Sequence, residues 1–297
     1  MKAKPWLNEL VLLLLLSTLW GASYTFIRLG VASIPPLTLM AARTLTAGLL
    51  LWTWMRMRGI HMPRTPAVWR RFLVQALLNS VLPFTLIAWA EQTVPAGLAT
   101  ILNSASPLFV FLATWWLAGH GSVAIARFAG VVLGFVGIAL VVGHSALSGL
   151  GAQVVPQLAI VLASVCYAGA AIYGHSFHGL PAVVPAAGSL LAGTALLLPL
   201  SLVVDRPWGL QPSGSSVLAL LALSVLSTAW ALVIYFRLVQ TLGSVGVTAQ
   251  AYLRVPIGVG MGVVFLGESL SGTAWTGMAL VVLGVAAMTV KTAASGR

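Results

Sequence analysis

The sequence is poor in charged residues. Only 6% of its 297 residues are Asp, Glu, Lys or Arg, against about 25% in soluble domains. Hydrophobic residues make up 60% of the chain, and the mean hydropathy is +1.03. So few charges cannot cover a water-exposed surface, which excludes a soluble enzyme or a soluble binding domain. The composition therefore predicts an integral membrane protein.

Cysteine, acidic residues and clustered histidines are also scarce. The single cysteine, Cys166, lies inside an apolar run, which excludes a disulfide framework and a thiolate metal set. His175 and His178 have no third ligand near them, so no metal and no cofactor is expected. A membrane enzyme would need clustered acids or histidines, so we do not expect an enzyme. The acids instead lie scattered at the ends of apolar runs: Glu9, Glu91, Asp205 and Glu268.

Long apolar runs recur along the whole chain, each close to the roughly 20 residues that a helix needs to cross a bilayer. Transmembrane strands are not expected, because no pattern of alternating ten-residue segments occurs. The first run follows a basic start and resembles a signal peptide, but it is long enough to span. Ten helices are predicted: Leu7–Leu29, Pro36–Trp54, Phe72–Ala90, Gly97–Leu117, Ala126–Val142, Pro156–Tyr173, Val183–Val203, Val217–Phe236, Ser244–Phe265 and Trp275–Val290.

The net charge of +11 is a topology signal rather than a nucleic-acid signal. If the N-terminus is cytoplasmic, almost all Lys and Arg outside the predicted helix interiors fall on the cytoplasmic side. Only Arg28 and Arg206 fall on the other side. This asymmetry follows the positive-inside rule, and it predicts a multi-pass protein with both termini in the cytoplasm and no nucleic-acid partner.

The chain contains an internal repeat. The stretch that begins "QTVPAGLATILNSASPLF" at Gln92 aligns with the stretch that begins "QTLGSVGVTAQAYLRVPIG" at Gln240, and it pairs Pro107 with Pro256. We therefore predict one five-helix repeat in residues 1–146 and a second in residues 147–297. Because five is odd, the second repeat inserts upside down, a plan typical of secondary transporters that bind substrate near the midplane.

These features resemble a known family. "LWGASY", "AARTLTAGLLL", "ASPLFVFLATWWLAG" and "VPIGVGMGVVFLGESLSGTAWTGMALVVLG" together resemble the EamA-type members of the drug/metabolite transporter superfamily over essentially the whole chain. The resemblance implies an all-helical fold and export of small metabolites, including amino acids, across the bacterial inner membrane. It also implies alternating access around a central cavity. The family's "LGE" is kept at Glu268, but it reads "LAGH" at His120, so an acidic role in the first repeat is not carried over.

Two arginines lie near helix midpoints with no acid at the same depth. Intramembrane arginines face a bundle interior or a cavity, so Arg43 and Arg254 predict an electropositive cavity that accepts a carboxylate. Pro256 frees the carbonyl of Tyr252, and an arginine that binds such a carbonyl is an equally open interpretation. Other polar or aromatic side chains within the spans complete the predicted cavity: Trp20, Tyr24, Asn79, Asn103, Tyr167, Thr228, Trp230, Gln250 and Tyr252. Helix packing is the alternative for each of them.

Prolines interrupt four of the predicted helices, at Pro83, Pro107, Pro199 and Pro256. Prolines kink helices, so these positions are predicted hinges for the rocking of one part against another. The sequence thus predicts a secondary transporter that exports small metabolites, foremost amino acids and among them aromatic ones. A hydrophobic drug or another metabolite as substrate, a channel and a membrane enzyme remain alternatives. The expected partners are the bilayer and a small molecule, and a monomer is compatible with the sequence.

Overall fold

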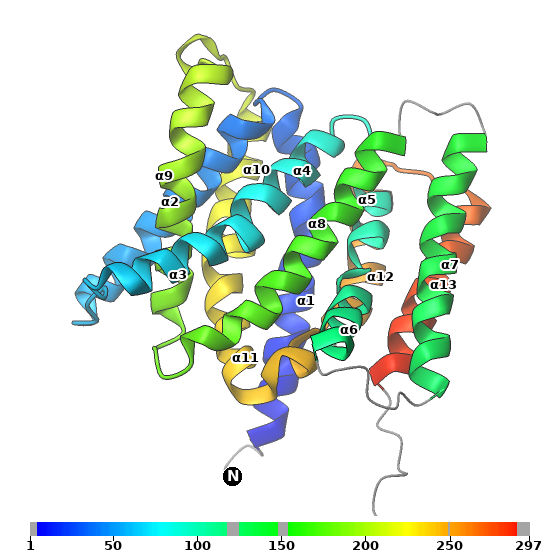
Figure 1. Ribbon diagram of the computed structural model, residues 1–297. Helices are drawn as coiled ribbons and strands as arrows, with labels where there is room; N and C mark the ends of the chain where they lie inside the picture. Colours follow the sequence, from blue (N-terminus) through cyan, green and yellow to red (C-terminus); the bar gives the residue numbers. More distant parts are fainter. Residues whose placement is uncertain (1–4, 118–124, 148–153, 249, 290–297) are drawn as a thin grey trace, which may run out of the picture.

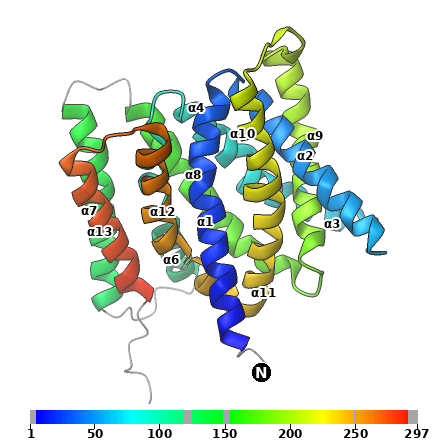
Figure 2. The same cartoon turned by 180° about the vertical axis from the view of Figure 1, so that it is seen from behind.

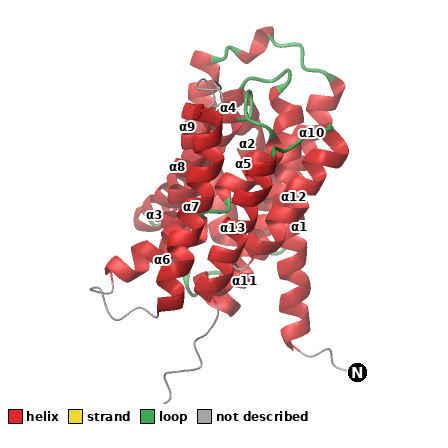
Figure 3. Ribbon diagram, turned by 90° about the vertical axis from the view of Figure 1, so that its right-hand side faces the viewer, coloured by secondary structure: helices red, strands yellow, loops and turns green. Residues whose placement is uncertain are grey.

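The computed structural model describes residues 5–117, 125–147, 154–248 and 250–289. Within these ranges the chain forms helices joined by short connections and contains no strand (Figure 3). This confirms the predicted all-helical membrane fold. Among the described residues, six stretches are long and apolar enough to cross a bilayer, and three shorter apolar helices accompany them. The count of ten spans remains a prediction.

The first part of the chain forms three long stretches and one broken stretch. Two residues, Ser104 and Ala105, separate α5 from α6, where the sequence predicted one helix over Gly97–Leu117. A π-helical segment, η1, joins α3 to α4 without a break, which gives the continuous apolar stretch Pro66–Ala90. The bounds are α1 Pro5–Val31, α2 Pro36–Met57, α3 Pro66–Ala76, η1 Leu77–Val81, α4 Leu82–Ala90, α5 Ala96–Asn103 and α6 Ser106–Leu117.

The rest of the chain, from α7 onward, contains another π-helical segment, η5. The short 3-10 turns η3 (Gly174–Phe177) and η4 (Pro207–Gly209) follow α8 and α9. The bounds of the helices are α7 Ile125–Leu147, α8 Val154–Tyr173, α9 Val183–Val204, α10 Gly214–Ser224, η5 Val225–Trp230, α11 Ala231–Thr248, α12 Gln250–Leu266 and α13 Gly272–Thr289.

The predicted boundary between the eighth and ninth helices is wrong. The sequence placed the end of one at Phe236 and the start of the next at Ser244, but α11 continues to Thr248 and α12 begins at Gln250. No proline lies between Pro212 and Pro256 to end the helix earlier. The longer α11 carries Val247 to the wall of the cavity described below.

The helices pack as a bundle in which α1 contacts α5, α10, α11 and α12. Helix α1 packs against α12, α2 packs against α9, and α7 packs against α13 at one edge of the bundle (Figures 1 and 2). Helix α1 begins and α13 ends at the same end of the bundle (Figure 1). We call this end the N-terminal end. Buried hydrophobic side chains of all of these helices belong to one core.

The positive-inside rule predicts that the N-terminal end faces the cytoplasm. A test uses a Cys166→Ala background, which lacks cysteine. His61 and Gln211 are both exposed, in the α2–α3 and α9–α10 connections respectively. A membrane-impermeant maleimide added to intact cells should label Gln211→Cys and should not label His61→Cys until the membrane is opened. The reverse pattern would overturn the orientation.

Candidate functional site: a polar cavity inside the bundle

A cavity lies between α1, α2, α4, α6, α8, α11 and α12. The space between its walls, including the part open to the surroundings, is about 860 Å³. Nine of the eleven side chains predicted from the sequence line it: Trp20, Tyr24, Arg43, Asn79, Asn103, Tyr167, Thr228, Gln250 and Arg254. The structure thus brings together residues from both predicted repeats.

Two predicted cavity residues do not join this set. Trp230 is 59% exposed on the outside of the bundle and does not line the cavity, so its predicted position is wrong. It follows Thr228 by two residues, and two residues on a helix point about 200° apart. Tyr252 belongs to α12, but its side chain lies outside the described part of the structure.

The break between α5 and α6 frees a backbone carbonyl that binds Arg254. Pro107 is the second residue of α6, and it has no N–H to donate to the carbonyl of Asn103, four residues earlier. Arg254 Nη2 donates to this free carbonyl at 3.1 Å, and Ser106 Oγ donates to it at 3.0 Å. Arg254 therefore does bind a carbonyl freed by a proline. The carbonyl is that of Asn103, however, and not that of Tyr252.

Close packing of two helices brings Arg254 to this position. A Cβ on Gly21 of α1 would lie 3.2 Å from the carbonyl oxygen of Arg254, and a Cβ on Gly258 of α12 would lie 3.2 Å from the carbonyl oxygen of Gly21. Such small residues let helix backbones approach closely. The contact sets the guanidinium of Arg254 beside the face of α1 that carries Trp20 and Tyr24.

Arg43 is held by a different set of neutral groups. It is 3% exposed, and its Nε donates to Thr228 Oγ1 at 2.7 Å. Its guanidinium carbon lies 3.6 Å from the ring centroid of Phe84, a cation–π contact that strengthens when water is excluded. Its Nη1 lies 3.7 Å from Met40 Sδ. No carboxylate of the described residues is bonded to Arg43.

The two π-helical segments both deliver cavity residues. Asn79 belongs to η1, and Ser227 and Thr228 belong to η5. In η5, Thr228 Oγ1 donates to the carbonyl of Leu223, five residues earlier, at 2.7 Å. Single π-helical turns inside α-helices are frequent at functional sites, because they turn side chains toward a ligand at the expense of regular helix bonding. No feature of the sequence predicted these two π-helical segments.

Aromatic and amide groups complete the wall. The rings of Trp20 and Tyr235 lie 5.3 Å apart between centroids, with their planes tilted by 43°, so they form one aromatic patch. Asn103 Nδ2 donates to the Tyr24 hydroxyl, and Ser164 Oγ donates to Asn103 Oδ1 at 2.9 Å. Sequence reasoning missed Tyr235. A signal was present, because Tyr235 follows Thr228 by seven residues and therefore lies on the same helix face.

The four predicted hinge prolines occupy three different settings. Pro107 is buried at the α5–α6 break and lines the cavity, and Pro83 is buried directly after η1. Pro199 and Pro256 lie inside the continuous helices α9 and α12, and both are exposed on the outside of the bundle. Pro107 and Pro256, paired by the repeat alignment, thus differ in environment. Their roles as hinges remain a prediction.

Glu268 has a structural partner at the end opposite the N-terminal end. Its Oε1 accepts from the backbone N–H of Ala96 at 2.6 Å, and its Oε2 accepts from that of Gly97 at 2.8 Å. Both N–H groups belong to the first turn of α5, where an anion is favoured. Glu268 therefore ties the loop before α13 to the start of α5. His120, its counterpart in the sequence repeat, lies outside the described residues.

Loss of this cap should lower stability. In Glu268→Gln the amide oxygen can accept only one of the two bonds and carries no charge, so we expect a loss of about 1–2 kcal/mol. The unfolding temperature in detergent measures it. Glu9→Gln is a suitable control, since Glu9 pairs with Arg237 at 3.7 Å near the surface and such pairs contribute about 0–1 kcal/mol. Equal effects of both substitutions would contradict the capping role.

Comparison with known proteins gives consistent matches. The EamA-like transporter family matches residues 7–143 and 155–290. The chain is 28% identical over 273 residues to the "Uncharacterized inner membrane transporter YedA" of Escherichia coli, covering 91% of this chain and 87% of that protein. It is 28% identical over 268 residues to a "Probable terminal-alkyne amino-acid exporter" of Streptantibioticus cattleyicolor, covering 90% and 88%. A solved structure titled "Crystal structure of protein" superposes with a TM-score of 0.66 at 22% identity, covering 95% of this chain and 97% of that one.

Proposed function

Because the chain belongs to the EamA-like transporter family, we propose that this membrane transporter exports small carboxylate-bearing metabolites, foremost amino acids and related compounds. In this proposal the cavity opens alternately to the cytoplasm and to the outer side of the bacterial inner membrane. One relative carries the name of a probable amino-acid exporter, which supports this substrate class.

One observation carries the proposal: two buried guanidinium groups line the cavity without an acidic partner. Arg43 and Arg254 are 3% and 6% exposed, and Arg254 Nε has no hydrogen-bond partner among the described residues. A buried, partly unsatisfied guanidinium is costly unless it meets an anion. A substrate carboxylate would supply that anion, and Arg offers it paired, charge-assisted hydrogen bonds.

The aromatic patch favours an apolar or aromatic side chain on the substrate. Trp20 and Tyr235 present their rings on the same side of the cavity, and large flat side chains bind such walls through area and ring geometry. The same patch would also hold an uncharged hydrophobic drug, which is the second candidate. The two candidates differ in whether the arginines contribute to affinity.

Flux into liposomes tests the proposal. Purified protein is reconstituted, and uptake of a labelled amino-acid panel is followed with and without a pH gradient. Saturable, competable uptake supports a carrier, whereas an unsaturable ohmic current would indicate a channel. Uptake of hydrophobic drugs without any uptake of carboxylates would favour the second candidate instead.

Arg254→Gln should reduce carboxylate uptake by about tenfold to a hundredfold. A hydrogen bond to a charged group contributes about 1.5–3 kcal/mol, and each 1.4 kcal/mol is about tenfold. The matched control is Arg237→Gln, which removes an arginine whose side chain is 54% exposed at the N-terminal end and should leave uptake nearly unchanged. Equal loss in both variants, or loss of folded Arg254→Gln protein alone, would argue for a structural role.

A further inference from the structure

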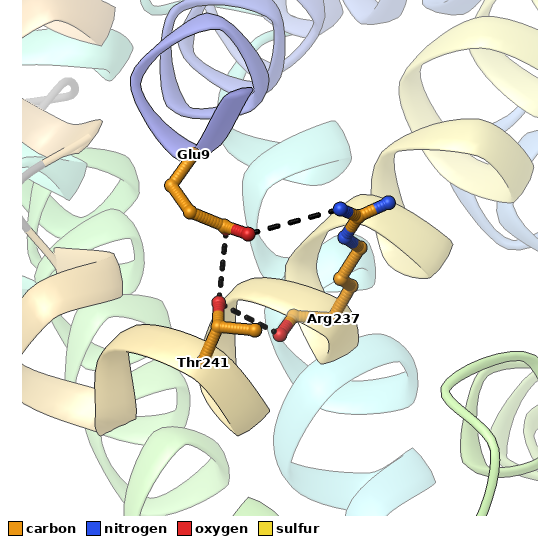
Figure 4. Close-up of polar contacts among 3 residues, drawn as sticks. All are labelled: Glu9, Arg237 and Thr241. Atoms are coloured by element: carbon orange, nitrogen blue, oxygen red, sulfur yellow. Dashed lines mark hydrogen bonds and ion pairs between the residues drawn. The ribbon is translucent and has the colours of Figure 1, made fainter. Parts of the chain in front are cut away.

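All four acidic side chains of the chain lie outside the cavity wall. Glu9 lies 3.7 Å from Arg237 Nη2 and accepts from Thr241 Oγ1 at 3.0 Å, at the N-terminal end (Figure 4). Asp205 follows α9 at the other end of the bundle, where it accepts from the N–H and hydroxyl of Thr38 at 2.7 and 2.8 Å.

The other two acids lie near the start of α5. Glu268 caps that helix, as described above. Glu91 is fully buried directly after α4, one helical turn beyond the cavity residue Ile87. The cavity wall therefore carries two arginines and no carboxylate, and neither guanidinium forms an ion pair with an acid among the described residues.

Several neutral acceptors in the cavity are already engaged. The Asn103 carbonyl accepts from Arg254, Asn103 Oδ1 accepts from Ser164, and Thr228 Oγ1 accepts from Arg43. Gln250 Oε1 is different, because it is buried and has no partner among the described residues. Gln250 lies one helical turn before Arg254 on α12, so the two side chains lie on the same face.

This arrangement disfavours the binding of a substrate ammonium group. An ammonium would stand beside two guanidinium groups with no carboxylate to pair with, and like charges repel more strongly where water is excluded. It would have only neutral oxygens, such as Gln250 Oε1 and Ser227 Oγ, in exchange for its full hydration. A substrate carboxylate at the same wall would instead be attracted by both guanidinium groups.

We propose that, within the carboxylate transport proposed above, the cavity binds substrates of net negative charge, whose amino group is absent or acylated, more tightly than free amino acids. An N-acylated amino acid fits the unpartnered atoms. Its carboxylate would bind Arg254, its amide N–H would donate to Gln250 Oε1, and an apolar side chain would rest on Trp20 and Tyr235. A free amino acid would bind more weakly, because it brings an ammonium to the same place.

Binding of matched ligands to the purified full-length protein in detergent tests this inference at neutral pH. N-acetyl-L-phenylalanine, L-phenylalanine and L-phenylalaninamide share one side chain and carry net charges of −1, 0 and +1. Titration calorimetry should show affinity falling in that order, with at least about a tenfold difference between the first two. The corresponding leucine pair repeats the comparison for a smaller side chain.

Two variants assign the effect to the named residues. Arg254→Gln should remove most of the difference between N-acetyl-L-phenylalanine and L-phenylalanine. Gln250→Leu should weaken N-acetyl-L-phenylalanine while leaving 3-phenylpropionate, which has no N–H, nearly unchanged. A structural role for either residue would instead weaken all ligands together.

The possible failures are distinguishable. If L-phenylalanine binds as tightly as its N-acetyl derivative, or more tightly, the preference for net anions is wrong while carboxylate transport stands. If no carboxylate binds to protein that remains monodisperse and folded, both this inference and the proposed function are wrong. If the cationic amide binds best, the electropositive cavity itself is contradicted.

Discussion

Gly284→Ala should strongly destabilise the contact between α7 and α13. A Cβ at this position would lie 2.5 Å from the carbonyl oxygen of Gly130 and 2.7 Å from the backbone N of Gly134. Both are backbone atoms, so no side-chain rotation relieves the clash and the two helices must move apart. Overpacking costs typically about 1–3 kcal/mol and sometimes more, which outweighs the roughly 1 kcal/mol that alanine gains over glycine in a helix.

The unfolding temperature in detergent and the yield of monodisperse protein measure the effect. Gly260→Ala provides the matched control, because it makes the same chemical change inside α12, where nothing lies within 4 Å of the added Cβ. This control should keep or raise the unfolding temperature. If both variants behave alike, the close approach of α7 and α13 does not limit stability.

Periodicity and composition predicted the parts of the fold that follow from hydrophobic length. The lack of charge required lipid-facing helices. The close contact of α7 and α13 through the glycines at 130, 134, 137, 277 and 284 was not predicted. Local departures from a regular helix were not predicted. Breaks and π-turns depend on which carbonyls find new donors, and those donors come from distant helices.

The cavity residues also divide into those that the sequence predicted and those that it did not. Depth in a span correctly selected Arg43 and Arg254, because a charge at that depth must face inward. For a large aromatic residue depth is not sufficient, since either face of the helix accepts it. Trp230 at 59% exposed and Tyr235 at 6% exposed illustrate this. Helical phase relative to Thr228 distinguishes them, and the sequence contained it.

The carbonyl that accepts the hydrogen bond of Arg254 was known only from the structure. The sequence offered Pro256 and the nearby carbonyl of Tyr252, which are local. In the structure the acceptor is instead the carbonyl of Asn103, which Pro107 leaves free. Asn103 precedes Arg254 by 151 residues in the chain. A proline predicts that a carbonyl is free, but only the packing of α5 against α12 determines which donor reaches it.

Glu91 is the acid whose environment differs most from what its position at a span end suggests. It directly follows the span Pro66–Ala90, it is fully buried, and neither carboxylate oxygen has a hydrogen-bond partner among the described residues. Burial raises the pKa of Glu91 well above its ordinary value, and the nearby Glu268 raises it further. Arg28 and Arg43 act in the opposite direction but do not cancel the increase.

The raised pKa of Glu91 determines how stability should depend on pH. The folded state holds the proton more tightly than the unfolded state, so the folded protein is favoured at low pH. As pH rises above the ordinary glutamate pKa, the unfolded chain releases its proton freely while the folded chain does not. Stability should therefore fall with rising pH, until the pH exceeds the raised pKa and the loss levels off.

Glu91→Gln, which resembles the protonated acid, should remove this dependence. We expect the unfolding temperature of the unmodified protein, followed by tryptophan fluorescence in detergent, to fall from about pH 5 to about pH 9. The variant should show a much flatter profile and should be the more stable protein at the alkaline end. Glu9→Gln leaves Glu91 in place and should keep the original profile. A Glu91→Gln profile that still falls with pH would show that another group holds the proton, because the substitution removes the only titrating atom at this position.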